Sequence, residues 1–364
     1  MTRFEPEPPH SHGVQPRIGV LLINLGTPDS PEVKDVRRYL REFLMDRRVL
    51  DIPFLKRFFL VHFVIAPFRA PRSSAAYKKL WTKEGSPIKV HTEKLKNLLQ
   101  DALGSDFDVE AAMRYQNPNI PSVLSTFKGR GYKKLIVIPL YPQYSSAANG
   151  SSIEAVLAEL RSWETFPELR IVSQFCEQPL FIKAFARNGQ RHLRKKQYDH
   201  VLFSYHGLPE TQIRRAACEN YCQLNDKCCS VYQVKNRYCY RAQCYHTSRL
   251  LAEELLLKAG QYTVCFQSRL GKTPWIKPYT DEVIVDLAKR GIKNLLVFSP
   301  SFVADCLETI VEIGMEYQHL FRQHGGSELD LVESLNAHED WVDCLKNLTL
   351  QESALPEENF LRNN

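Results

Sequence analysis

Three glutamates at four-residue intervals, Glu308, Glu312 and Glu316, follow an apolar run near the end of the chain. A helix over this segment places the three carboxylates along one face. Like charges at this spacing repel by roughly 0.2 to 0.5 kcal/mol per pair unless water, protons or a metal ion intervene. The pattern indicates a site that binds a divalent cation or conducts protons. Its structural alternative is a capping arrangement of Asp305 and Glu308 at a helix N-terminus, with the other carboxylates solvated.

A histidine at the end of another apolar run is the second candidate. His206 stands in the sequence SYHGLP, where a buried strand is expected to end. A neutral imidazole near pH 7 accepts protons and binds divalent metals, although a lone histidine before a turn is more often structural. Ligands of open parallel sheets bind beyond the carboxyl ends of the strands. We therefore expect the imidazole and the carboxylates to meet there, to bind a metal ion or carry protons away.

The segments MRYQNP and YPQYS place Arg114, Tyr115 and Tyr141 at the ends of expected strands. Rings that stack, hydroxyls that hydrogen-bond and a cation that balances carboxylates suit a large planar acidic ligand, although tyrosines at strand ends are also ordinary packing. The sequence has no GxGxxG or Walker A motif that opens a helix, so a nucleotide ligand has no phosphate cradle.

Six of the ten cysteines fall between Cys218 and Cys244, with the spacing C-x3-C-x5-CC-x9-C-x4-C. Cytoplasmic clusters of this density usually bind metal rather than form disulfides. The spacing matches no standard zinc or ferredoxin signature, and six candidates exceed the four ligands that such a centre needs. The expected ligands are Cys222, Cys228, Cys239 and Cys244, with Cys218 and Cys229 as alternates.

An internal repeat indicates the elements that must position these groups. Arg130 to Ile138 reads RGYKKLIVI and Arg290 to Phe298 reads RGIKNLLVF, with five of nine positions identical. The segments IGVLLINLGTP and HVLFSYHGLP also resemble each other, and the second contains His206. The chain is therefore expected to form two similar halves with a ligand crevice between or above them.

Short apolar runs bounded by glycine or proline alternate with helical patterns. This alternation predicts an α/β fold of two similar Rossmann-like halves, each a parallel sheet with helices on both faces. The expected strands are residues 18–25, 109–114, 135–141, 169–175, 201–205, 262–267 and 295–300.

The expected organisation is a disordered tail, two α/β domains, a helical segment and a second tail. Their ranges are 1–16, 17–190, 191–325, 326–350 and 351–364. The polar N-terminus lacks the apolar region of a signal peptide, which predicts a cytoplasmic protein. The 364 residues, 44% of them hydrophobic, are ample for two cores.

The net charge of +7 suits an acidic small molecule or an anionic membrane surface, whereas no long basic run marks a nucleic-acid-binding surface. Residues 47–71 include an apolar run that is cut by His62 and Pro67 and is too short to span a bilayer. This segment is either a core helix or an exposed apolar lip that contacts a membrane or a greasy substrate. The oligomeric state is left open.

From about Ile18 to Leu348 the chain resembles the ferrochelatase family, whose members insert ferrous iron into a porphyrin. The motifs stand in family order: INLGTP, YxxLWxxxGSP, MRYQNP, YPQYS, SYHGLP, FQSRLGKTPW, PYTDE and FVADCLET. The resemblance implies a chelatase-like fold and a catalytic metal site of His206 and Glu308, which would convert Fe2+ and protoporphyrin IX to protoheme. It also implies a pocket wall of Arg114, Tyr115, Trp275 and Phe302, beside which we place Tyr141.

The resemblance implies that Glu312 and Glu316, together with Asp305, form a path for protons or metal away from this site. It favours the lip interpretation of residues 54–71, at a porphyrin entrance. Some bacterial members carry a [2Fe–2S] cluster with internal cysteine ligands, so the cysteine-rich insertion is expected to hold such a cluster or zinc. The alternatives are a coproporphyrin ferrochelatase, a related cobalt or nickel chelatase, and a non-catalytic tetrapyrrole-binding protein.

Overall fold

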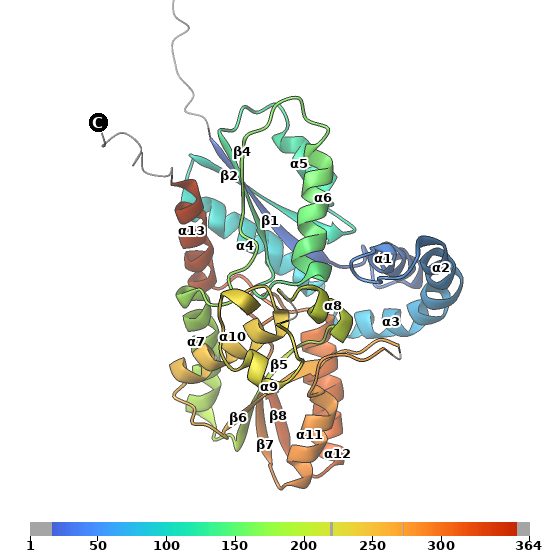
Figure 1. The fold of residues 1–364 in the computed structure, drawn as a ribbon, viewed down its shortest axis with the longest axis vertical. Helices are drawn as coiled ribbons and strands as arrows, with labels where there is room; N and C mark the ends of the chain where they lie inside the picture. The colour runs from blue at the N-terminus through green and yellow to red at the C-terminus, as the bar shows by residue number, and fades with distance from the viewer. Residues whose placement is uncertain (1–16, 219–220, 272, 355–364) are drawn as a thin grey trace, which may run out of the picture.

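The computed structural model describes residues 17–218, 221–271 and 273–354, which form two α/β halves with one topology (Figure 1). Each half has a four-stranded parallel sheet, in the order β2-β1-β3-β4 in the first half and β6-β5-β7-β8 in the second. The first sheet consists of β1 (Ile18–Gly26), β2 (Phe107–Tyr115), β3 (Lys134–Pro139) and β4 (Glu168–Ile171). The second consists of β5 (His200–His206), β6 (Tyr262–Gln267), β7 (Asn294–Phe298) and β8 (Glu328–Leu331). The predicted pair of similar parallel halves is confirmed.

The repeated sequences form the third strand of each sheet, β3 and β7, each of which pairs with the first strand of its half. Their central residues are fully buried, which requires apolar side chains on both faces. This need for burial on two sides explains why the two segments read as short continuous apolar runs rather than as alternating patterns.

Helices cover both faces of each sheet. In the first half, α4 (Pro87–Leu103) and α13 (Glu339–Ser353) pack on one face, and α5 (Ile120–Phe127) and α6 (Ser151–Leu160) pack on the other. In the second half, α7 (Pro179–Lys195) and α10 (Tyr240–Glu254) oppose α11 (Thr280–Lys289) and α12 (Gln318–Gln323).

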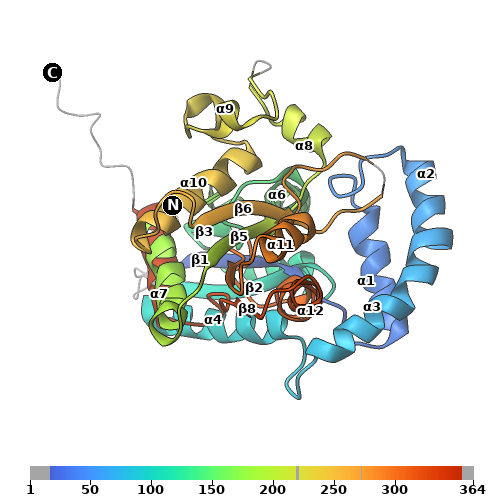
Figure 2. The ribbon, with the colours of Figure 1, turned by 90° about the horizontal axis from the view of Figure 1, so that it is seen from below.

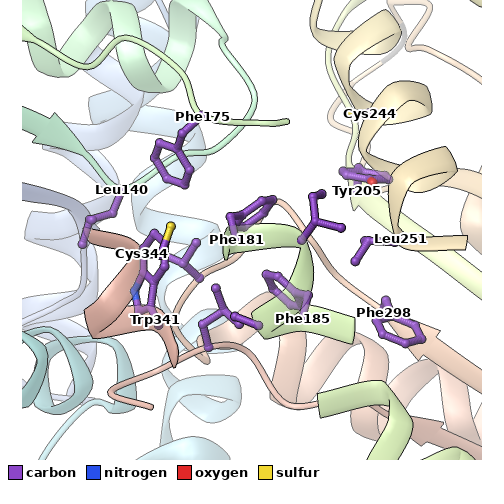
Figure 3. Close-up of a cluster of buried hydrophobic side chains, with 14 of the residues drawn as sticks. Leu140, Phe175, Phe181, Phe185, Tyr205, Cys244, Leu251, Phe298, Trp341 and Cys344 are labelled. Carbon is purple, nitrogen blue, oxygen red and sulfur yellow. The ribbon is translucent and has the colours of Figure 1, made fainter. Parts of the chain in front are cut away.

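One apolar core joins the two halves. It contains Leu140, directly after β3, and Phe298 of β7, and the rings of Phe181 and Trp341 lie between them (Figure 3). The centroids of these two rings are 6.2 Å apart. The helix α13 therefore crosses back from the second half to pack on α4 and α7 (Figure 1).

Two predicted boundaries differ from the structure. The helical segment expected at 326–350 begins with the strand β8, and α13 continues to Ser353, beyond the start of the expected tail at residue 351. β8 was missed because its four residues, ELDL, are too few to establish an alternating pattern. The tail expected at 1–16 lies outside the described residues, as does the part of the second tail after residue 354.

Four helical elements project to one side of the sheets (Figure 2). They are α1 (Val33–Met45), α2 (Phe54–Phe59), the π-helix η1 (Leu60–Ile65) and α3 (Ala66–Leu80). The elements α2, η1 and α3 follow one another without a break, so the chain stays helical through Pro67 and through Pro71 inside α3. The helix α8 (Glu210–Arg215) precedes the cysteine-rich insertion of residues 218–244. The described part of the insertion forms α9 (Asp226–Cys229), the short 3-10 helix η3 (Val234–Asn236) and the start of α10.

Candidate metal and porphyrin site

His206 is the last residue of β5, at the carboxyl edge of the second sheet. β6 lies on one side of β5 and β7 on the other, which is where a parallel sheet opens a ligand crevice. The imidazole Nδ1 lies 2.6 Å from the carbonyl oxygen of Gly207, and this contact favours a proton on Nδ1. The Nε2 atom then carries the lone pair that binds a metal ion or accepts a proton.

Two aromatic rings flank this imidazole. The ring centroid of Trp275 lies 6.3 Å from that of His206, and the centroid of Phe302 lies 6.4 Å from it. Trp275 is fixed by a hydrogen bond of 3.0 Å from its Nε1 to the carbonyl oxygen of Leu270. Flat apolar faces beside a nitrogen ligand suit the binding of a planar macrocycle.

Glu308 begins the π-helix η4 (Glu308–Tyr317), which follows the loop after β7. Burial raises the pKa of the phenols of Tyr39 and Tyr77, and the neighbouring charge of Glu308 raises both further. These phenols belong to α1 and α3, so Glu308 faces the helices that project from the first half. The predicted metal site is therefore bordered by elements of both halves.

Glu312 lies one turn further along η4 and is held by two hydroxyl groups. Ser268 Oγ donates to its Oε2 at 2.6 Å, and the Tyr317 hydroxyl donates to its Oε1 at 2.9 Å. Burial raises the pKa of Glu312, the two hydroxyl groups lower it, and the charges of Glu308 and His206 act on it in opposite directions. A carboxyl group whose pKa is raised stays protonated to a higher pH than usual and can exchange protons with a neighbouring imidazole.

Gln267, which the sequence analysis did not select, links the two strand ends to η4. It is the register partner of His206 in the β5–β6 pair. Its Nε2 lies 3.4 Å from the Glu308 carbonyl oxygen and 3.5 Å from Glu312 Oε2, and its Oε1 accepts from Ser204 Oγ at 2.8 Å. Gln267 could have been identified from the segment FQSRLG, because it is a polar residue at the end of a largely apolar expected strand.

The other two path candidates lie in different environments. Asp305 accepts hydrogen bonds from Asn336 Nδ2 at 2.7 Å, from Thr309 Oγ1 at 3.2 Å and from the Ser334 amide at 3.2 Å. These bonds tie the start of η4 to the loop after β8. Glu316 is exposed at the far end of the same helix.

The expected pocket-wall residues Arg114 and Tyr115 converge on Asp46, at the end of α1. Arg114 Nη2 donates to Asp46 Oδ2 at 2.7 Å, and the Tyr115 hydroxyl donates to the same oxygen at 2.9 Å. Burial acts to raise the pKa of Asp46, but the hydrogen bonds from Ser151 and the Arg48 amide, together with the Arg114 charge, lower it overall. Asp46 was missed because its partners are distant in sequence. Tyr141 is half-buried, and burial raises the pKa of its phenol.

The projecting helices α2, η1 and α3 expose a group of large apolar side chains, which we call the lip. The exposed fractions of these residues run from 51% to 79%. The members are Phe54, Leu55, Phe59, Phe63, Val64 and Phe68. Phe58 is partly buried and stacks on His62, with centroids 4.4 Å apart. Within the described residues, the helices are each too short or too polar to cross a membrane.

The cysteine-rich insertion contains free thiols that lie close together. Cys228 Sγ and Cys229 Sγ are 3.8 Å apart. A hydrogen bond with Cys239, followed by burial, raises the pKa of Cys229, and the same bond lowers the pKa of Cys239. Cys244 is fully buried on α10. Among the described side chains, no group of three or more His, Cys, Asp or Glu residues is arranged to hold a metal ion.

Paired parallel α/β halves, with an imidazole and carboxylates at the carboxyl edge of one sheet, define a protein of the chelatase type. The fold resembles that of SirB from Bacillus subtilis with Fe3+, at a TM-score of 0.50 and 13% identity. The two structures match over 93% of this chain and 96% of that chain. Because only 13% of the residues are identical, the similarity shows a shared fold and nothing about function.

The family model described as ferrochelatase matches residues 17–353. The ferrochelatase of Legionella pneumophila (strain Lens) is 46% identical over 332 residues, which is 91% of this chain and 98% of that protein. The ferrochelatase of Coxiella burnetii (strain Dugway 5J108-111) is 46% identical over 329 residues, which is 90% of this chain and 92% of that protein. The chain belongs to the ferrochelatase family. It is an enzyme of heme biosynthesis, with ferrous iron as a substrate.

Proposed function

We propose that this ferrochelatase inserts Fe2+ into protoporphyrin IX to give protoheme, and that His206 and Glu308 are its metal ligands and catalytic residues. The observation that carries the proposal is the contact of the His206 ring with the rings of both Trp275 and Phe302. Its Nδ1 is engaged by Gly207, which leaves Nε2 available at the strand end.

Metal insertion requires the porphyrin to lose two pyrrole protons and Fe2+ to lose water. A closed aromatic pocket can bind the ring bent, which exposes the nitrogen lone pairs and applies binding energy to the distorted substrate. His206 Nε2 accepts a pyrrole proton in this proposal after the iron has passed to the ring, because its single lone pair cannot hold the metal and the proton together. Glu312 then receives protons from this centre, and Glu316, exposed on the same helix, continues the path toward solvent. Asp305 holds the start of η4 in place.

The lip and the pocket wall favour protoporphyrin IX over coproporphyrin. Protoporphyrin carries two apolar vinyl groups where coproporphyrin carries further propionates, and apolar groups suit an entrance of exposed phenylalanines. The positive charge of Arg114 is already balanced by Asp46. The expected pocket wall therefore offers little positive charge to the additional propionates of coproporphyrin. Comparing kcat/KM for the two porphyrins tests this choice, and a preference for coproporphyrin would reject it.

The test of the proposed function is direct. Purified protein, Fe2+ and protoporphyrin are mixed anaerobically, and formation of the heme spectrum is followed for the wild type and for His206→Ala. We expect heme formation in the wild type and its near loss in the variant. Full activity of His206→Ala would contradict the assignment of the site.

We also propose that the cysteine-rich insertion holds a [2Fe–2S] cluster or zinc that stabilises the segment. Cys229 Sγ lies 3.8 Å from Cys228 Sγ and shares a hydrogen bond with Cys239, whereas the Cys244 thiol is hydrogen-bonded to Tyr240. The proposed ligands are therefore Cys222, Cys228, Cys229 and Cys239, with Cys229 in place of the expected Cys244. Thiolates of this kind retain iron or zinc and supply folding energy to a loop without a large core of its own. Iron, sulfide and zinc analysis after anaerobic purification tests the proposal. Metal-free, fully titratable thiols would reject it.

The lip is further proposed to contact a membrane surface peripherally. Its exposed phenylalanines form a larger apolar surface than single scattered side chains would. Co-sedimentation with anionic lipid vesicles tests this contact, and equal sedimentation of the wild type and of Phe63→Ser would reject it.

A further inference from the structure

Tyr240 lies next to the proposed catalytic histidine, although it belongs to the cysteine-rich insertion. It is the first residue of α10 and directly follows Cys239. The Tyr240 hydroxyl donates a hydrogen bond of 2.9 Å to the carbonyl oxygen of His206. The side chain is buried, with 6% of its surface exposed, so water does not readily replace this bond.

The backbone around His206 is held from several sides. Ser301 Oγ accepts a bond of 3.3 Å from the His206 amide, and the Gln267 carbonyl oxygen accepts one of 2.7 Å from the Gly207 amide. Tyr240 therefore holds one end of the peptide group between His206 and Gly207, and Gln267 holds the other. The carbonyl of Gly207, the next group along the chain, is the acceptor that orients the imidazole through Nδ1.

We infer that Tyr240 is a positioning residue for His206: it fixes the peptide whose orientation sets the direction of the imidazole Nε2. The inference rests on the proposed role of His206. Tyr240 does not contact substrate in this account, and it acts only through the backbone. Small displacements of a reacting group lower the rate of the chemical step strongly, because the reacting atoms must be aligned.

Through Tyr240 the cysteine-rich insertion contributes to the reaction without transferring iron. The hydroxyl of Tyr240 also interacts with the thiol of Cys244, one turn along α10. A segment folded around its thiols places the start of α10, and with it Tyr240, against the end of β5.

The substitution Tyr240→Phe removes the hydroxyl and keeps the ring. We expect kcat for heme formation to fall by about 10-fold while KM for porphyrin stays within about twofold, because positioning of His206 changes and the pocket wall does not. Tyr205→Phe is the matched control. Tyr205 is the preceding residue of β5 and belongs to the buried apolar cluster (Figure 3). Its hydroxyl lies 2.8 Å from Ser248 Oγ, so Tyr205→Phe also removes one buried hydroxyl contact.

Unfolding curves of both variants show whether the loss of kcat exceeds a general loss of stability. Normal kcat in Tyr240→Phe, or an equal loss in Tyr205→Phe, would overturn the inference. If Tyr240→Phe is unfolded at the assay temperature, kcat is compared with the wild type at a lower temperature at which circular dichroism shows the variant folded, and a normal kcat there would overturn the inference. His206→Ala is measured alongside. Its full activity would reject the proposed function, whereas its inactivity together with normal Tyr240→Phe rejects only the positioning role.

Discussion

Ser268 Oγ lies 2.6 Å from Glu312 Oε2, and this hydrogen bond ties the end of β6 to the π-helix that begins with Glu308. The donor stabilises the ionised carboxylate and so lowers the pKa of Glu312, while burial, the larger effect, raises it. The balance between these two effects sets the pH at which Glu312 can accept a proton.

Ser268→Ala is expected to raise the pKa of Glu312 further, because it removes a hydrogen bond that stabilises the ionised carboxylate. The ionised form is then present only at higher pH. The acid limb of the kcat profile should therefore move to higher pH, which pH–rate measurements would show. Ser162→Ala, on the surface, should leave the profile unchanged. An unmoved limb in Ser268→Ala would mean that Glu312 does not control proton removal.

His206→Ala and Glu308→Ala should each lower kcat and kcat/KM together by roughly 100-fold or more, because both remove groups that act in the transition state. Steady-state kinetics under anaerobic conditions measure the effect. Glu312→Gln should lower kcat less than either alanine variant does, because Glu312 lies beyond the proposed metal site. Circular dichroism serves as the control for folding, and near-normal turnover in either alanine variant would contradict its role.

Replacement of Phe59, Phe63 and Phe68 by serine should weaken porphyrin affinity or vesicle binding with little loss of stability, because these side chains are already exposed. Phe181→Ala is the contrast, since that ring is fully buried and its truncation costs roughly 3 to 5 kcal/mol. Urea unfolding and fluorescence titration with porphyrin separate the two effects. A large stability loss in the serine variants with unchanged affinity would show that the lip is part of the core.

Asp46→Asn should destabilise the protein by about 1.5 to 3 kcal/mol near neutral pH and raise KM for porphyrin, because Arg114 loses its ionic partner. The native pKa of Asp46 is lowered, so its contribution is present above the unfolded pKa and is lost as pH falls through the folded pKa. The difference from wild type should therefore shrink in acid, which urea unfolding at a series of pH values would detect. Asp340→Asn, which breaks a surface pair with Arg187, is the control and should cost at most about 1 kcal/mol.

The repeat, the strand runs and the motifs were sufficient to predict the two halves and the strand end on which His206 stands. These features are local, because a buried parallel strand needs a continuous apolar run and a turn at its end. The strand β8 escaped prediction because four residues do not establish a period.

The lip shows where local pattern becomes ambiguous. An apolar run with interrupting histidine and proline is compatible with a core helix and with an exposed surface, because both need a helix with many apolar residues. Only the arrangement of α1 and α3 against the rest of the chain decides which side chains remain uncovered.

The sequence by itself determined the fold class, the family and the motif residues His206 and Glu308. Tertiary structure alone decided that Asp46 engages Arg114, that Gln267 bridges β6 and η4, and that Tyr240 reaches the carbonyl of His206. These contacts join residues 34 to 68 positions apart, so no periodic pattern along the chain records them. They arise because close packing of the completed sheets and helices brings polar groups together in places where each buried group needs a partner.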